Sequence, residues 1–192
     1  MKRFFVLLPA FLVLCFQPSA KAVYVELGIN YAYKKSTYDN LNNTEQQSTT
    51  GSLSFYAWEQ LGIELSYTNG LYVQKAKSYG SSVALQRTTT QYSDIYGADL
   101  IYLLTGKQSR FQPFIKGGAA YIRKKQVVQD DGQPANEAVP TPGVAPSYGV
   151  GLKYFLTESL AIRAGYDVIR TPIDSSTTVD DITGRVGLSW IL

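Results

Sequence analysis

The sequence contains no histidine among its 192 residues, and its one cysteine, Cys15, lies near the N-terminus. Histidine is the usual general base near neutral pH and the commonest metal ligand, so its absence argues against hydrolysis and acyl transfer. No cysteine follows residue 22, which excludes a disulfide or a thiolate metal site in the rest of the chain. Neither a phosphate-binding loop nor a Gly-x-Ser-x-Gly elbow occurs. We therefore expect a protein that is not an enzyme and that holds neither a metal nor a cofactor.

Long hydrophobic runs are missing as well, except at the N-terminus. There, Lys2 and Arg3 precede an apolar run from Phe4 to Phe16, and Ala20-Lys21-Ala22 has the small-residue pattern of a cleavage site. The run is too short to cross a membrane comfortably as a helix. The pattern predicts a secretory signal peptide over residues 1–22 and a single domain over residues 23–192, with a short N-terminal anchor as the alternative.

An excess of charge of one sign is also absent from the predicted domain. The whole chain carries +3, but Lys2, Arg3 and Lys21 lie in the predicted signal peptide. The remaining residues therefore have equal numbers of basic and acidic side chains, 15 of each sign. This balance argues against a nucleic-acid partner, which requires a basic surface.

The sequence is dominated by an alternation of period two. In Ser147–Val168, one phase is apolar with tyrosines at its ends, whereas the other phase consists of glycine and charged residues. This alternation indicates a β-strand with two different faces. It recurs eight times, over residues 23–34, 52–57, 61–68, 91–104, 111–123, 148–156, 160–168 and 181–192. The fourth segment is the least regular, because Asp94 interrupts its apolar phase.

The connections between these eight segments alternate in length. Residues 58–60, 105–110 and 157–159 form short connections, and residues around 35–50, 69–90, 124–146 and 169–180 are long, polar and loop-like in composition. Strict alternation places all long loops at one end of an up-and-down barrel. Short periplasmic turns and long extracellular loops are typical of outer-membrane barrels. The prediction is therefore an all-β, eight-stranded antiparallel transmembrane barrel.

The positions of the aromatic residues indicate whether the apolar face points into the barrel or toward lipid. A soluble, lipocalin-type barrel would turn this face inward. Here the aromatic residues fall at two levels flanking an aliphatic band, as in membrane barrels. The predicted girdle near the long loops comprises Tyr33, Tyr67, Tyr92, Tyr121, Tyr148 and Tyr166, and the girdle near the short turns comprises Tyr102, Tyr154 and Trp190. The apolar face is therefore expected to meet lipid.

The opposite phase places charges of both signs in the lumen. Because a charge in a narrow lumen is costly unless it is paired, we expect a structural network that plugs the barrel and fixes the strand register. Its predicted members are Glu26, Glu64, Asp99, Lys116, Lys153, Arg163 and Arg185, and Asp167 and Asp181 share the inward phase. A narrow ion pore is the alternative. A channel for hydrophobic solutes would require an apolar lumen, which this pattern does not predict.

Three stretches carry a resemblance to a known family: FQPFIKGGAAY, SYGVGLKYFLTESLAIRAGYD and the terminal GRVGLSWIL. With them the chain resembles the OmpA-like eight-stranded outer-membrane β-barrel family, the outer membrane protein beta-barrel domain. The resemblance implies the outer membrane of a Gram-negative cell, contact with its lipid and lipopolysaccharide, assembly by the periplasmic barrel-insertion machinery, and no cofactor. The family usually ends in phenylalanine, where this chain has Leu192.

Besides the narrow ion pore, two functions remain open at this point. The chain is expected to be a structural outer-membrane barrel, or a surface protein whose long loops bind a host surface, a matrix protein or a phage. Positive charge in or near the second and third loops would suit lipopolysaccharide phosphates or an acidic glycan. The residues concerned are Lys75, Lys77, Arg87, Lys124 and Lys125.

Overall fold

The computed structural model describes residues 24–37, 42–78, 85–131, 133–172 and 178–192, so the predicted signal peptide lies outside the described residues. Among these residues, no helix has the length and apolar character needed to cross a membrane. The described chain forms β1 (Tyr24–Thr37), β2 (Asn43–Tyr56), β3 (Leu61–Ser78), β4 (Leu85–Leu103), β5 (Phe111–Asp130), β6 (Asn136–Ala138), β7 (Gly143–Phe155), β8 (Leu160–Pro172) and β9 (Thr178–Ile191).

Eight of these strands form a closed antiparallel ring. The order is β4-β3-β2-β1-β9-β8-β7-β5, and pairing between β4 and β5 completes it. The short β6 pairs only with β5, through three residue pairs beginning at Gln126↔Ala138. The prediction of an eight-stranded up-and-down barrel is therefore confirmed.

The strands are staggered around the ring. Residue pairs can be followed from strand to strand once around the ring, starting at Tyr121 in β5. The path returns to β5 at Phe111, which lies ten residues before Tyr121 in the sequence. The path is Tyr121↔Tyr96↔Tyr67↔Gly51↔Ile29↔Leu188↔Ile162↔Tyr154↔Phe111. A stagger of this kind accompanies strands tilted by roughly 35–45° from the barrel axis.

The two phases of each strand face different environments, as predicted. Leu27 and Ile63 are 46% and 52% exposed on the outside, whereas Glu64 and Arg163 are 1% and 5% exposed inside. Between the two aromatic girdles, the outward-facing residues of the strands are mostly aliphatic residues and glycine. The hydrophobic surface is thus turned outward, toward lipid, which is the reverse of a soluble barrel.

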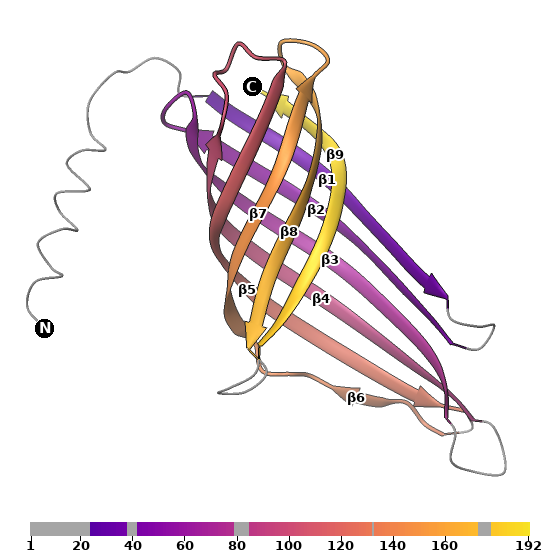
Figure 1. Cartoon of the computed structure of the whole chain (residues 1–192). Helices are drawn as coiled ribbons and strands as arrows, with labels where there is room; N and C mark the ends of the chain where they lie inside the picture. Colours follow the sequence, from indigo (N-terminus) through magenta and orange to yellow (C-terminus); the bar gives the residue numbers. More distant parts are fainter. Residues whose placement is uncertain (1–23, 38–41, 79–84, 132, 173–177) are drawn as a thin grey trace, which may run out of the picture.

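The predicted long loops are wrong over much of their length. Residues 35–37, 43–50, 69–78 and 85–90 continue the strands, and the β3–β4 ladder runs up to Ser78↔Leu85. In Figure 1, β1 to β5 project together beyond the ends of β7, β8 and β9. A hairpin that has left the membrane has water on both faces, so it needs no apolar phase. Threonine, as in Thr88–Thr90, still favours the extended conformation.

The seam between the first and last strands is the shortest ladder of the ring. It has six residue pairs, from Glu26↔Ile191 to Tyr31↔Val186, although β1 continues to Thr37 and β9 begins at Thr178. Beyond Tyr31 the two strands diverge, and Figure 1 shows β1 and β9 running apart on the extracellular side. Above this pair, the described residues of β1 and β9 are therefore not joined by backbone pairing.

Candidate functional site in the barrel lumen

Glycines make room for the charged side chains of the lumen. A Cβ atom at Gly149 would lie 2.5 Å from Asp167 Oδ1 and 3.1 Å from Lys116 Cε. At Gly118 an added Cβ would collide with the backbone carbonyl oxygen of Ala98. The glycine-charge alternation of the inward phase is therefore a packing requirement of a narrow cylinder, because side chains from all eight strands converge there.

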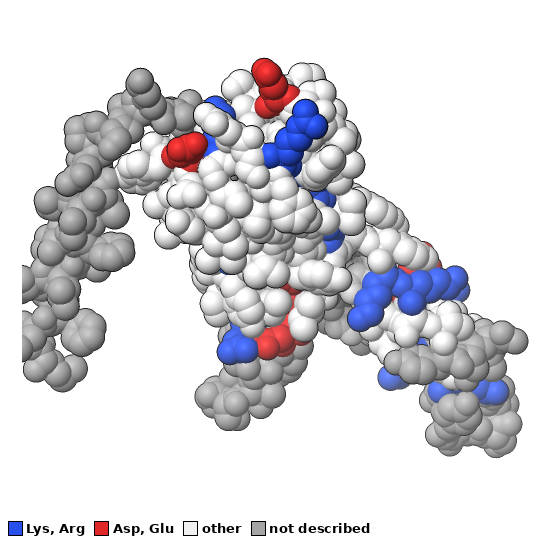
Figure 2. All heavy atoms as spheres, turned by 45° about the horizontal axis from the view of Figure 1, so that its top comes forward, with Lys and Arg blue, Asp and Glu red and all other residues white. Residues whose placement is uncertain are grey.

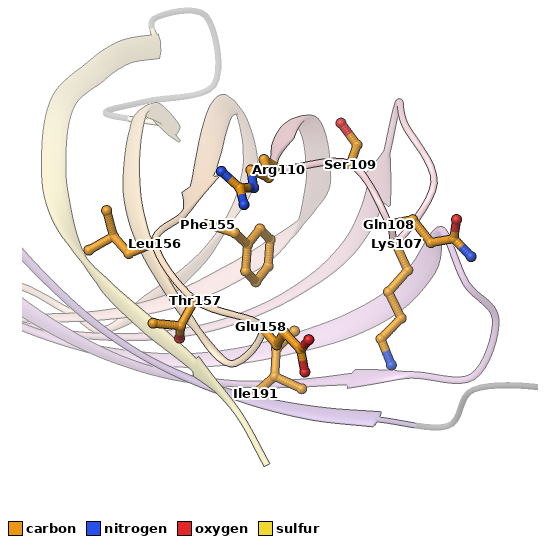
Figure 3. Close-up of a pocket in the computed structure, with 9 residues that line it drawn as sticks. All are labelled: Lys107, Gln108, Ser109, Arg110, Phe155, Leu156, Thr157, Glu158 and Ile191. Carbon is orange, nitrogen blue, oxygen red and sulfur yellow. The ribbon is translucent and has the colours of Figure 1, made fainter.

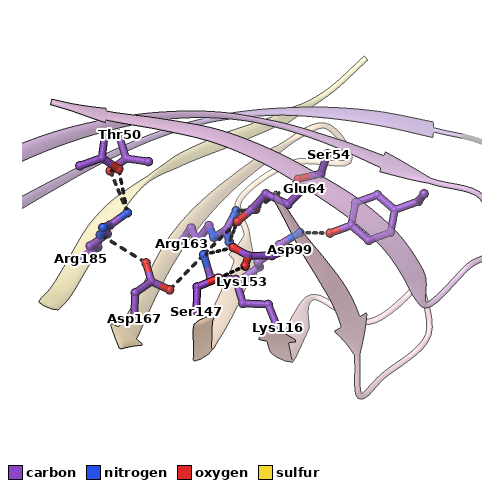
Figure 4. A network of polar contacts seen from close by, with 12 residues as sticks. Thr50, Ser54, Glu64, Asp99, Lys116, Ser147, Lys153, Arg163, Asp167 and Arg185 are labelled. Atoms are coloured by element: carbon purple, nitrogen blue, oxygen red, sulfur yellow. Dashed lines mark hydrogen bonds and ion pairs between the residues drawn. The ribbon is translucent and has the colours of Figure 1, made fainter. Parts of the chain in front are cut away.

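Glu64 is the acceptor at the centre of the network (Figure 4). Both terminal nitrogens of Arg163 donate to its carboxylate, and Lys116 Nζ donates to Oε1 over 3.0 Å. Ser54 Oγ donates to Oε2 over 3.2 Å. Strands β2, β3, β5 and β8 supply these four residues, so the cluster joins opposite sides of the wall.

Lys116 extends the network toward the extracellular side. Its Nζ atom lies 3.0 Å from Asp167 Oδ1 and 3.5 Å from Asp99 Oδ2. Asp167 Oδ2 in turn lies 3.2 Å from Arg185 Nε, and Arg185 Nη1 donates to Thr50 Oγ1 over 2.8 Å. These charges therefore form one continuous chain of ion pairs.

A second cluster lies at the periplasmic end of the lumen. Lys153 Nζ donates to Glu26 Oε2 over 2.6 Å and to the Tyr56 hydroxyl over 2.7 Å. The ring of Tyr56 stacks on Tyr24 with centroids 4.4 Å apart, and Lys107 Nζ lies 4.4 Å from the Tyr24 centroid on the other side. Tyr24, Tyr56, Ile101, Leu103 and Phe114 form a buried hydrophobic cluster here. Aromatic rings and cations therefore close this end together.

The two clusters are balanced in charge. Four carboxylates face four cations, and every one of the eight lies within 4.0 Å of an opposite charge; the members are Glu26, Glu64, Asp99, Asp167, Lys116, Lys153, Arg163 and Arg185. Their side chains are at most 19% exposed. All seven residues of the predicted network lie in these clusters. Asp181, which shares the inward phase, does not join them.

Sequence reasoning missed the neutral members of the network. Thr50, Ser54, Tyr56 and Ser147 each bond to one of the charges. All four occupy the inward phase of their strands, so the phase itself was the available signal. The charged partner of each residue depends on the stagger between the strands, and the alternation within a single strand does not predict this stagger.

Cavities lie at both ends of the lumen and at the level of the network. A cavity of about 320 Å³ lies on the extracellular side and is called the vestibule below. At the level of the network, two cavities of about 20 Å³ each remain. A cavity of about 670 Å³ lies among the periplasmic turns. It is lined by apolar residues, Phe155 and Ile191 among them, and by the charged residues Lys107, Arg110 and Glu158 (Figure 3). Within the described residues, no group of three or more acidic or cysteine side chains could hold a metal ion.

The aromatic residues of the two predicted girdles all lie on the outer wall. Each is at least 42% exposed: Tyr33, Tyr67, Tyr92, Tyr121, Tyr148, Tyr166, Tyr102, Tyr154 and Trp190. Tyr31 and Tyr96, which the prediction omitted, lie at the extracellular level as well. The rings of Tyr67 and Tyr121 lie 5.1 Å and 6.4 Å from that of Tyr96, forming a row across three strands.

The basic residues predicted for the loops are spread over the hairpin extension. Lys75 and Lys125 are exposed, and Lys125 lies 3.0 Å from Glu137, whereas Lys124 faces the vestibule. Lys77 donates its backbone N–H to Asn42 Oδ1 over 2.9 Å. Figure 2 shows Lys and Arg gathered on the projecting end of the molecule, while the visible barrel wall is largely uncharged.

Two bidentate arginine pairs join neighbouring strands at or beyond the level of the extracellular tyrosines. Arg87 donates to Asp130 over 2.7 Å and 2.9 Å, and Arg170 donates to Asp180 over the same distances. The hydrogen bonds from the guanidinium groups lower the pKa of both aspartates. These pairs link β4 to β5 and β8 to β9 near their extracellular ends.

Comparison with known proteins identifies the family. The outer membrane protein beta-barrel domain matches residues 6–190. No curated protein matches the sequence. The solved N-terminal beta-barrel domain of Pseudomonas aeruginosa OprF is similar with a TM-score of 0.55 and 16% identity, over 88% of this chain and 97% of that one.

Two further solved barrels are similar. OprG from Pseudomonas aeruginosa has a TM-score of 0.58 and 13% identity, over 90% of this chain and 97% of its own. Neisserial surface protein A has a TM-score of 0.50 and 16% identity, over 88% and 95%. At these identities the likeness concerns the fold, and it agrees with the outward apolar wall. The chain belongs to the outer membrane protein beta-barrel domain family and is located in the outer membrane.

Proposed function

We propose that the chain is a structural outer-membrane barrel with no catalytic role, whose lumen is plugged by its own side chains. The observation that carries this proposal is the neutral, paired set of eight charges across the lumen, where the two cavities described at this level have about 20 Å³ each. An eight-stranded barrel is just wide enough to be filled by side chains. A hydrated ion would have to break several buried ion pairs in order to pass.

Conductance across a planar bilayer tests the plug. We expect the refolded protein to give no large, stable, reproducible single-channel steps. The double variant Glu64→Ala/Arg163→Ala, which opens the central cluster without leaving one partner unpaired, should conduct more than the native protein. Regular steps from the native barrel would contradict the plug and favour a narrow ion pore.

A surface role is the second candidate, and the hairpin extension favours it. β1 to β5 project beyond the mouth, and exposed cations such as Lys75 and Lys125 lie on them, suited to lipopolysaccharide phosphates or to an acidic glycan on a host or phage. Replacing both lysines by glutamate should weaken cell adhesion and lipopolysaccharide binding. Arg110→Glu, at an exposed position in a periplasmic turn, is the control, and equal adhesion by both variants would count against this role.

Export and assembly complete the proposal. Residues 1–22 would direct the chain across the inner membrane, and N-terminal sequencing of the mature protein should then begin at Val23. The barrel-insertion machinery would assemble the strands, with Leu192 at the position of the family's terminal phenylalanine. Leu192→Phe should leave the folded barrel unchanged and raise, or leave equal, its yield in the outer membrane.

The absence of catalysis can be tested on lipid directly. Lipid A extracted from cells with and without the gene should have identical mass spectra. A mass difference corresponding to a gained or lost acyl chain or phosphate would instead indicate an enzyme.

A further inference from the structure

The vestibule is a polar cavity of about 320 Å³ enclosed by strands from both sides of the ring. Most of its lining consists of uncharged hydrogen-bonding side chains, among them Gln46, Gln91, Ser93 and Thr183. Such groups can both donate and accept hydrogen bonds. The cavity has the size of a small-ligand site, and it lies directly above the charge network.

Three charged side chains line the vestibule, and two of them have no charged partner. Arg185 is already engaged, since it lies 3.2 Å from Asp167 and donates to Thr50. Within the described part of the chain, neither Lys124 nor Asp181 forms an ion pair, although both are partly buried. They come from β5 and β9, which are three steps apart in a ring of eight. An unmatched cation and an unmatched anion therefore lie on opposite walls of one cavity.

This arrangement is complementary to a ligand that carries both charges. A partly desolvated ammonium or carboxylate gains most from a charge-assisted hydrogen bond to an opposite charge. We propose that the vestibule binds a zwitterion of amino-acid size, with its anionic group at Lys124 and its primary ammonium group at Asp181. The amides and hydroxyls between them would bind the remaining polar atoms.

Two sources could supply this chemistry. One is a free amino acid that enters through the mouth. The other is the phosphoethanolamine headgroup of a membrane lipid, for which the unpaired stretch between β1 and β9 would be the route. β1 and β9 separate above Tyr31 and Val186, and Tyr31 lies at the level of the extracellular tyrosines, where headgroups are found.

Calorimetric titration of the detergent-solubilised barrel tests the proposal. The probes are serine and O-phosphoethanolamine, and propionate and ethanolamine serve as ligands of a single charge. We expect saturable binding of the zwitterions, with a Kd on the order of 1 mM or lower, and at least about tenfold weaker binding of the singly charged probes. Lys124→Gln and Asp181→Asn should each abolish this preference.

Matched variants separate the site from general charge effects. Lys125→Gln removes the neighbouring cation, which is exposed and paired with Glu137, and should bind as the native protein does. The exchange Lys124→Asp/Asp181→Lys restores one charge of each sign and should recover binding of zwitterions. Heat-modifiable migration on a gel shows that each variant is folded.

Nanodiscs distinguish the two sources. If phosphatidylethanolamine discs weaken serine binding several-fold relative to phosphatidylcholine discs, the lipid headgroup occupies the site, because a quaternary ammonium cannot donate to Asp181. Equal affinity in both discs supports a free ligand. The proposal is overturned if the zwitterions do not bind saturably, if singly charged probes bind equally well, or if neither single variant changes the binding.

Discussion

At the scale of single residues, the lumen is governed by the cost of burying charge. Lys153 is fully buried, and Glu26 is 1% exposed beside it. Two such charges stabilise a fold only as a pair, because either one alone would lack both water and a counter-ion. The Tyr56 hydroxyl adds a neutral acceptor, 2.7 Å from Lys153 Nζ. The pair is therefore best examined by removing one partner and then both.

Lys153→Met should destabilise the barrel by about 3–5 kcal/mol, because it leaves the Glu26 carboxylate buried without a cation. The double variant Lys153→Met/Glu26→Met should recover most of this loss. Reversible urea unfolding in lipid vesicles measures both. Lys125→Met, at an exposed position, is the control and should stay near the native stability. Equal stability of the single and double variants would show that the pairing contributes nothing.

A glycine substitution tests how closely two neighbouring strands approach each other in the wall. Gly118→Ala should cost about 1–3 kcal/mol, because the new Cβ meets the Ala98 carbonyl oxygen of the neighbouring strand. Gly51→Ala is a matched control, since nothing lies within 4 Å of its added Cβ. The same unfolding experiment should therefore separate the two alanine variants, and a loss of equal size in both would contradict the steric explanation.

At the scale of the strands, the extension of the hairpins depends on polar contacts, since the projecting segments have water on both sides. Arg87–Asp130 holds β4 to β5 in the projecting segments, and Arg170–Asp180 holds β8 to β9 at the ends of these shorter strands. Both aspartates have a lowered pKa because an arginine donates to them. A carboxyl group with a lowered pKa in the folded state stabilises the folded state at pH values above its unfolded-state pKa, which is near 3.9. This contribution is lost as the pH falls through the pKa of the folded state.

Acid should therefore loosen the hairpin ends before it affects the barrel. Between pH 7 and pH 5 we expect no change at Asp130 and Asp180. Below about pH 4 we expect faster amide exchange around both residues, while the lumen strands stay protected. NMR in nanodiscs, corrected for the intrinsic pH dependence of exchange, measures this. Asp130→Asn should show the loosened β4–β5 end already at pH 7, and an unaltered end there would contradict the role of the pair.

The alternation of period two predicted the membrane strands and their two faces, because the contrast between lipid and a narrow lumen acts on every residue there. It failed for residues 69–78 and 85–90, which form strands rather than loops. Outside the membrane no apolar face is required, so the pattern disappears although the pairing continues. Threonine-rich stretches such as Thr88–Thr90 were the remaining signal, and their β-preference was outweighed by the polar composition.

At the scale of the whole molecule, the stagger of ten residues decides which charges meet. Lys153 reaches Glu26 across the ring, and Arg163 reaches Glu64, although each pair is far apart in the sequence. The sequence predicted the members of the network, but any of several pairings would have satisfied its charge balance. The actual partners depend on strand order and stagger together, which are properties of the closed ring rather than of any single strand.

The seam gives a prediction for the ring as a whole. In β1, residues 26–31 have a partner strand on both sides, whereas residues 32–37 pair only with β2. Every second backbone amide over residues 32–37 should therefore exchange quickly, and those bonded to β2 should exchange slowly. Hydrogen exchange followed by NMR in nanodiscs would reveal this alternation. Uniform protection would instead mean that β1 and β9 join further up than Tyr31–Val186.

The position of this seam also constrains the order of folding. The two strands that close the cylinder come from opposite ends of the polypeptide, so their contact carries the largest loop-closure entropy of the ring. Hairpins can form early from neighbouring strands, but the wall remains an open sheet with two unpaired edges until β9 pairs with β1. Both edges of this sheet must therefore be protected from other partners until β9 has paired. A truncation that removes only β9 would leave the sheet unable to close.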